Sequence, residues 1–171
     1  MVAVDAPPYF GGLGEPSVRP YSTEDHPWAV GLLEETGGRY RVRRGNVVDV
    51  AVLPGLVGSR DGVLNTLVTI TRHSHNFELS AIASDPFDEE LVQQVVKASL
   101  QYRNPDCQRS YAIVSNAQLK VQRALQLAGF RLCATRPGGM ESLARRSEYP
   151  IVTRFDGLEV RDEVEFDLLV F

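Results

Sequence analysis

The sequence contains two histidines whose spacing suits metal binding. His73 and His75 are two residues apart, so on an extended strand both side chains would lie on one face and could ligate the same ion. No third ligand of suitable spacing follows, and the polar run from Ser74 to Asn76 predicts a turn. We therefore expect exposed turn histidines and no metal site.

A second group with chemical potential is an acidic triplet in the stretch SDPFDEELVQQVVKAS, residues 84–99. Apolar residues recur at helical spacing from Leu91 onward, which places Asp88, Glu89 and Glu90 at the beginning of a helix. Carboxylates at a helix N-terminus stabilise it by about 0.3–1 kcal/mol each, and Asp88 suits the N-cap. The pattern predicts a helix that caps itself.

The arginines of the segment RYRVRRGN form the one basic cluster of the sequence: Arg39, Arg41, Arg43 and Arg44. On an extended segment they could face an anionic ligand, including a phosphate. The default interpretation is a solvated, irregular basic loop.

The elements that would position these residues follow from periodicity. Apolar spacing predicts a helix over 26–37, and turn signals at Asp61-Gly62 and at 74–76 divide residues 53–85 into three antiparallel strands. Beyond the acidic helix we expect a strand over 110–116, a helix over 117–129 with Leu119, Ala124, Leu125 and Ala128 inward, and a strand over 130–135. A short helix over 139–147 and a strand over 163–171 complete the order. This order predicts an α/β (α+β) fold with a mixed sheet and helices on both faces.

Composition limits the class of protein. The chain has 171 residues with 43% hydrophobic and 23% charged residues, which is typical of one globular domain. Residues 1–17, rich in proline and glycine, are expected to form a flexible arm, and residues 18–171 a single domain.

The charge balance and the two cysteines indicate which partners and which cellular compartment to expect. A net charge of −4 with interspersed signs predicts no nucleic-acid partner, and no window is long and apolar enough for a membrane span. Cys107 and Cys133 lack a CxxC spacing and are expected to be small buried residues in a reducing cytoplasm.

Several segments resemble the GNAT N-acetyltransferase superfamily, in particular a bacterial subgroup of it. The strand-ending Ser115-Asn116 followed by a helix closed by Gly129-Phe130 is similar to its second cofactor motif. The segments GFRLCATRPG and RDEVEFDLL resemble the end of the subgroup, and VRPYSTED resembles its first strand and turn. Arg145 and Arg146 also match the subgroup, without an evident role.

The resemblance implies a GNAT-like, mostly antiparallel central sheet that splays open between the strand ending at Asp85 and the strand ending at Asn116. It implies acetyl-CoA as co-substrate, with the backbone of Ile82, Ala83 and Ser84 holding pantetheine. Asn116 either bonds the cofactor or caps the helix from Ala117. Glu78 stands where some members keep a base; the alternative is a carboxylate that points to solvent from an alternating strand.

Two positions depart from the family pattern. The family binds the CoA diphosphate on a glycine-rich, basic turn, but this chain has Phe87, Asp88, Glu89 and Glu90 there, and each carboxylate would repel the anion by about 1 kcal/mol. The position of a tyrosine general acid falls on Leu125. The first departure predicts that the usual CoA-binding mode is lost, and the second weakens the case for catalysis.

Two functions therefore follow from the sequence. One is an acetyl-CoA-dependent N-acetyltransferase of a small amine or a peptide. The other is a non-catalytic GNAT-fold module, a pseudoenzyme that binds a ligand or a partner subunit. In the second case the chain forms a homodimer or pairs with an active paralogue.

Overall fold

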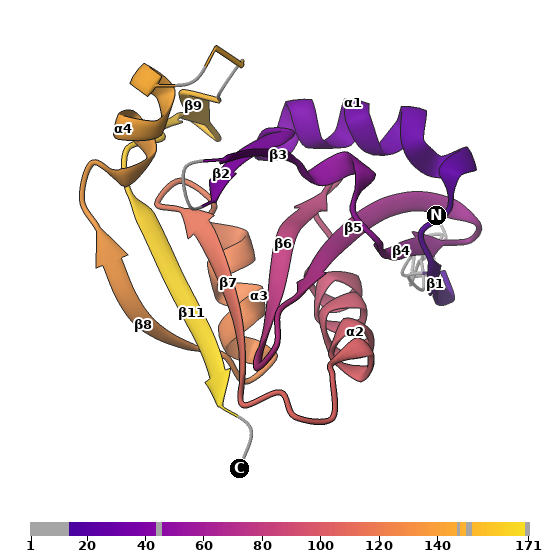
Figure 1. Ribbon diagram of the computed structural model, residues 1–171. Helices are drawn as coiled ribbons and strands as arrows, with labels where there is room; N and C mark the ends of the chain where they lie inside the picture. The colour runs from indigo at the N-terminus through magenta and orange to yellow at the C-terminus, as the bar shows by residue number, and fades with distance from the viewer. Residues whose placement is uncertain (1–13, 44–45, 147, 150–151, 170–171) are drawn as a thin grey trace, which may run out of the picture.

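A seven-stranded sheet is the centre of the molecule (Figure 1). The computed structural model describes residues 14–43, 46–146, 148–149 and 152–169. In spatial order the strands are β1 (Pro16–Pro20), β4 (Gly55–Arg60), β5 (Val63–Arg72), β6 (Asn76–Ser84), β7 (Arg109–Ser115), β11 (Glu163–Leu169) and β8 (Arg131–Arg136). Every neighbouring pair is antiparallel except β6 and β7, which are parallel. The predicted mixed, mostly antiparallel sheet is confirmed.

Helices cover both faces of the sheet. Helix α1 (His26–Thr36) packs on one face, while α2 (Glu89–Ser99) and α3 (Leu119–Leu127) pack on the other. A fourth helix, α4 (Gly139–Arg146), follows β8, and three 3₁₀ turns span Thr23–Asp25, Val50–Val52 and Leu100–Tyr102. Within the described chain, no helix is both long enough and apolar enough to cross a membrane.

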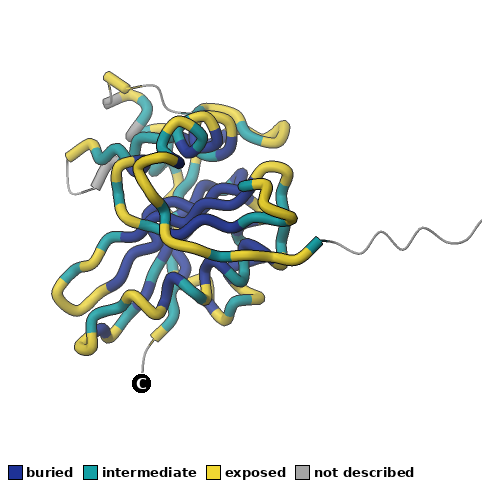
Figure 2. Tube along the Cα trace, turned by 90° about the vertical axis from the view of Figure 1, so that its right-hand side faces the viewer, coloured by how far each residue is buried: buried dark blue, intermediate teal, exposed yellow. Residues whose placement is uncertain are grey.

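Two apolar clusters explain why each face holds its helices. Leu91 and Val95 of α2 and Leu125 of α3 join one cluster with the sheet, and Ala29 and Leu33 of α1 join the other. Figure 2 shows the buried residues concentrated in the central strands. Burying such side chains stabilises the fold by roughly 1.5–3 kcal/mol each.

One predicted core position is wrong. Leu119 was expected to point inward, but its side chain is 56% exposed. The helix begins at Leu119 itself, so this residue lies at the end of the helix rather than over the sheet.

Two short hairpins lie outside the main sheet. The predicted irregular basic loop is wrong: β2 (Tyr40–Arg43) pairs with β3 (Asn46–Asp49). A second hairpin joins β9 (Arg154–Phe155) to β10 (Leu158–Glu159) through Asp156-Gly157. Both turn residues have positive φ, 49° and 79°, as in the predicted turn at Asp61-Gly62, where φ is 48° and 78°. Asp-Gly is the dipeptide that such a turn favours.

The two C-terminal segments that carried the resemblance meet in space. Arg136 of β8 forms ion pairs with Glu163 and Glu165 of β11, and the Gly138 N–H donates to Asp162 at 2.8 Å. Arg109 of β7 approaches Glu165 from the other side at 2.5 Å. These segments therefore hold the last strands together.

Of the two cysteines, one follows the prediction and the other does not. Cys107 is buried, as expected. Cys133 is exposed, as are most residues of the edge strand β8.

The predicted N-terminal arm is described only at its end. Residues 1–13 lie outside the described residues, and Pro16 and Ser17 already belong to β1.

Candidate functional site

The parallel pair β6–β7 separates halfway along its length. The two strands are in register from Asn76–Arg109 to Leu79–Ala112 and no further, although β6 continues to Ser84 and β7 to Ser115. Beyond that point β6 stays paired with β5, and β7 stays paired with β11. Figure 1 shows the two strands diverging toward their carboxyl ends. The inner edges of both strands thus offer backbone groups to an extended ligand.

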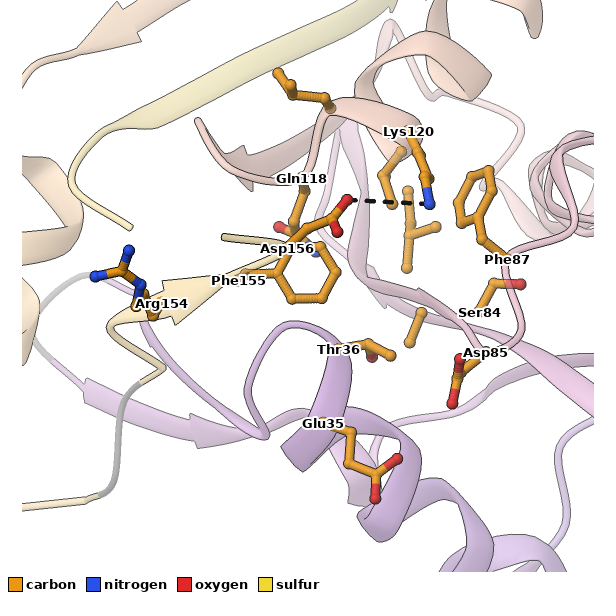
Figure 3. Close-up of a pocket in the computed structure, with 14 residues that line it drawn as sticks. Glu35, Thr36, Ser84, Asp85, Phe87, Gln118, Lys120, Arg154, Phe155 and Asp156 are labelled. Carbon is orange, nitrogen blue, oxygen red and sulfur yellow. Dashed lines mark ion pairs between the residues drawn. The ribbon is translucent and has the colours of Figure 1, made fainter. Parts of the chain in front are cut away.

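A pocket of about 340 Å³ occupies this splay (Figure 3). Its lining comes from the end of β6, the segment between β6 and α2, the start of α3, the β9–β10 hairpin and the end of α1. Its lining residues are Glu35, Thr36, Ile82, Ala83, Ser84, Asp85, Phe87, Gln118, Leu119, Lys120, Val121, Arg154, Phe155 and Asp156. Ile82, Ala83 and Ser84, the three predicted backbone contacts, all line this pocket, and their role toward a cofactor stays a prediction.

The pocket has an apolar interior and charged walls. Ile82, Phe87 and Phe155 contribute apolar surface. Lys120 and Asp156 face each other across it, with 3.9 Å between Nζ and Oδ2, as the dashed line in Figure 3 marks. A ligand with an apolar body and a few polar groups matches such a lining.

The first turn of α2 is occupied by its own side chains. Asp88 caps the helix, as predicted, by accepting from the Leu91 N–H at 2.9 Å. The Asp88 N–H in turn donates to the Ser84 hydroxyl at 3.2 Å. Two of the backbone donors that would otherwise face an anion at this helix start are therefore already used.

Two arginines partly neutralise the acidic triplet. Arg60 of β4 contacts Asp88 at 2.6 Å and Glu90 at 2.8 Å, and Arg123 of α3 pairs with Glu89. The hydrogen bonds from Arg60 hold the pKa of Asp88 below its usual value despite partial burial, and the Leu91 N–H adds to this effect. The three carboxylates and the two guanidiniums together leave one net negative charge at this helix start. The acidic triplet alone would carry three.

Glu78 is buried, and its predicted exposure to solvent is wrong. Its relative exposure is 3%, and its Oε2 accepts from the Tyr111 hydroxyl at 3.0 Å. His73 lies 3.4 Å from the same oxygen and 3.3 Å from the Tyr111 hydroxyl. Glu78 and Tyr111 are partners in register, one step before the strands separate. Three titratable groups thus meet at the inner end of the splay.

The two histidines therefore differ. His75 is exposed, as expected, whereas His73 is half-buried against Tyr111 and Glu78. Among the described residues, no three His, Cys, Asp or Glu side chains are grouped to hold a metal ion.

Asn116 does not cap the following helix, and that alternative is wrong. Its Oδ1 accepts from the backbone N–H groups of Arg161 and Asp162 at 2.9 and 3.0 Å, and its Nδ2 donates to the Glu159 carbonyl. The N-cap of α3 is Gln118. Asn116 is not among the residues lining the splay pocket, and its role toward a cofactor stays a prediction.

Two of the four arginines of the predicted basic cluster have described side chains, and these two have different partners. Arg39 is bound to Asp49 of the neighbouring strand, with its Nη2 at 2.6 Å from Oδ2, which accounts for one of the four guanidiniums. Arg41 donates to the Tyr40 carbonyl. The side chain of Arg43 and the whole of Arg44 lie outside the described residues.

Similar solved structures share this architecture. No protein-family model matches the sequence, and no curated protein sequence does either. A Bacillus subtilis acetyltransferase in complex with CoA is 16% identical, with a TM-score of 0.62, over 92% of this chain and 100% of the other. A GNAT family acetyltransferase from Elizabethkingia anophelis with acetyl-CoA bound is 12% identical, with a TM-score of 0.58, over 91% and 98%.

The third comparison concerns an enzyme with a known acceptor. Diaminobutyrate acetyltransferase from Paenibacillus lautus, in complex with L-2,4-diaminobutyric acid and coenzyme A, is 13% identical, with a TM-score of 0.62, over 91% and 95%. The chain has the GNAT acetyltransferase fold.

Sequence reasoning missed three groups of this GNAT-fold site. Tyr111 and His73 reach Glu78 from another strand and a turn, and only the sheet order shows that they do. The β9–β10 hairpin, which supplies Phe155 and Asp156, was missed as well. Its signal was the Asp156-Gly157 dipeptide, the same type of turn that was recognised at Asp61-Gly62.

Proposed function

We propose that this chain is an acetyltransferase-like protein whose splay pocket binds an acyl-pantetheine group. The observation that carries this proposal is the pocket where β6 and β7 separate, lined by Ile82, Ala83 and Ser84. The unpaired inner edge of β6 suits the amides of a pantetheine arm, and the apolar lining suits its methylenes. Two of the similar structures contain coenzyme A and one contains acetyl-CoA, which supports acetyl-CoA as the co-substrate.

The proposal includes the loss of the usual diphosphate site. The amides of Asp88 and Leu91 are satisfied within the chain, and the first turn of α2 keeps a net negative charge. Both features oppose a diphosphate at this helix start. The pantetheine and acyl parts of the ligand then contribute most of the binding free energy.

Glu78 is the general base in this proposal. The amine nitrogen of the acceptor attacks the thioester carbonyl carbon, and its proton passes to the Glu78 carboxylate directly or through water. The carbon–sulfur bond then breaks, and the sulfur leaves as a thiolate that takes its proton from solvent. Tyr111 fixes that carboxylate through its hydroxyl hydrogen bond. The acceptor is a small amine or a peptide amine; diaminobutyrate in one similar structure is a precedent for the former.

A non-catalytic module is the second candidate, and the residue at position 125 favours it. Leu125 is fully buried in the core between α3 and the sheet, so no side chain at this position donates a proton to a leaving thiolate. In this case the pocket binds its ligand without turnover. The chain would then act as a homodimer or as the partner of an active paralogue.

Calorimetric titration with acetyl-CoA and with acetyl-pantetheine tests the proposed ligand. Without a working diphosphate site, the two Kd values should agree within about threefold. Leu119→Trp should weaken both ligands by about tenfold or more, because Leu119 is exposed and lines the pocket. Leu127→Trp is the matched control: Leu127 is also an exposed leucine of α3 but does not line the pocket.

Two results would contradict the proposal. If acetyl-CoA binds about 100-fold more tightly than acetyl-pantetheine, the diphosphate has a site and its proposed loss is wrong. If neither ligand binds at millimolar concentration, the pocket does not take an acyl-pantetheine.

A further inference from the structure

A second cavity lies beside the splay pocket, between α4 and the β9–β10 hairpin. Its volume is about 490 Å³. Its lining residues are Glu141, Ala144, Arg145, Thr153, Arg154, Glu159, Val160 and Arg161. Three arginines against two glutamates leave one net positive charge in a chain whose net charge is −4.

The three guanidinium groups are not equally engaged. Arg161 pairs with both glutamates, Glu159 and Glu141, and these three side chains together keep one net negative charge. Arg154 donates to the Gly157 carbonyl at 3.3 Å, which uses one of its five N–H donors. Arg145 is exposed and forms no ion pair within the described part of the chain. Arg145 and Arg154 therefore carry the excess positive charge of this cavity.

Their placement gives both residues access to one ligand. Arg145 comes from α4 and Arg154 from β9, so two separate elements bring guanidiniums to the same cavity. Figure 3 shows the Arg154 guanidinium pointing away from Phe155 and Asp156, although its residue also lines the splay pocket. Planar guanidiniums bind carboxylates and phosphates through paired N–H donors.

We propose that the cavity between α4 and the β9–β10 hairpin binds a carboxylate or phosphate group through Arg145 and Arg154. This inference does not rest on the acyl-pantetheine ligand, because the site is defined by its own residues and shares only Arg154 with the splay pocket. It also gives Arg145, which the sequence left without a role, a function.

Titration of the protein with inorganic phosphate and with succinate at constant ionic strength tests this site. Heat or chemical-shift changes should saturate in the millimolar range, as expected for a small anion held by two guanidiniums. If phosphate binds more tightly, the ligand carries a phosphate group. If succinate binds more tightly, the ligand carries a carboxylate. Arg145→Gln and Arg154→Gln should each weaken binding by about fivefold to tenfold, and the double variant should abolish saturation.

Arg131→Gln is the control, because Arg131 is an exposed arginine of β8 that does not line the cavity. Its Kd should equal that of the wild type. Equal weakening in all three single variants would contradict the proposal, since it would indicate a general effect of net charge. The absence of saturable binding of either anion to the wild type would also overturn it.

Discussion

Glu78 illustrates how much the partner strand decides about a single residue. A carboxylate on an alternating strand is normally exposed, and that rule predicted solvent contact for Glu78. In the structure Tyr111 of the parallel strand donates to it and His73 lies beside it, so a buried carboxylate has hydrogen-bond partners. Buried side-chain carboxylates normally have hydrogen-bond partners of this kind.

Replacing Glu78 by glutamine tests its proposed role as a base. The amide is isosteric and still accepts the Tyr111 hydrogen bond, so the fold and the affinity for acetyl-pantetheine should be kept. Acetyl transfer to an amine, followed as release of free thiol, should fall by about 100-fold or more because the proton acceptor is lost.

Glu34→Gln, on the exposed face of α1, is the matched control and should leave the rate unchanged. If wild type and Glu78→Gln release thiol at the same background rate while both bind the ligand, Glu78 is not a base. The non-catalytic module is then the better description.

At the scale of elements, the beginning of α2 combines a helix cap with an ion pair between strand and helix. Asp88 caps the helix through Leu91 and binds Arg60 of β4 with the same carboxylate. Arg60 also donates to the Gly14 carbonyl, so the helix start, β4 and the segment before β1 are joined. These stabilising contacts are sufficient to account for an acidic turn without glycine.

Asp88→Ala should therefore lower the free energy of unfolding by about 1–2 kcal/mol, which is the usual cost of losing an N-cap. Asp88→Ser should lower this free energy by less than half as much, because a serine hydroxyl still accepts from the Leu91 N–H. Serine loses only the ion pair with Arg60. Urea unfolding at neutral pH measures both. An equal loss in the two variants would mean that the ion pair, and not the cap, stabilises this turn.

At the scale of the whole molecule, carboxylates paired with arginine recur across the sheet and its connections. Hydrogen bonds from Arg19 lower the pKa of Asp25 far below its ordinary value and outweigh its burial. Burial alone would raise the pKa values of Asp49 and Glu165, but Arg39 in the first case and Arg109 and Arg136 in the second lower them. Arg109 and Arg136 join β7 and β8 to Glu165 of β11, whereas Arg19–Asp25 and Arg39–Asp49 join residues six and ten positions apart.

These lowered pKa values predict loss of stability in acid. The unfolded chain takes up protons at pKa values near 3.8 for Asp and 4.5 for Glu, where the folded carboxylates still resist protonation. The stabilisation is thus complete above about pH 5 and decreases as the pH falls toward the folded-state values. The free energy of unfolding, measured in urea, should be several kcal/mol lower at pH 3 than at pH 7.

Asp25→Asn isolates one of these contributions. The variant should be less stable than wild type by about 2 kcal/mol at pH 7. The difference should shrink toward pH 3, because the Asp25 carboxyl of the unfolded wild-type chain takes up a proton there while that of the folded chain stays ionised. Asp106→Asn, on an exposed loop, should follow the wild-type curve. A difference that is constant with pH would show that the charge of Asp25 is not the cause.

The sequence by itself determined the elements whose signals are local. Helical spacing fixed α1 and α2, Asp61-Gly62 fixed the hairpin between β4 and β5, and Asp88 was identified as a cap. These features depend on neighbours within a few residues, so periodicity and turn chemistry are sufficient. The same signals placed Ile82 to Ser84 at the end of the strand that borders the pocket.

Only the tertiary structure decided which distant side chains meet. The partners of Glu78 lie on β7 and in the turn before β6, the counter-charge of Asp88 lies on β4, and the bonds of Asn116 reach the segment before β11. The arginines of the second cavity likewise come from two elements. Such contacts depend on sheet order and register, which arise from burial of the whole core, whereas a sequence pattern specifies only the face on which each side chain lies.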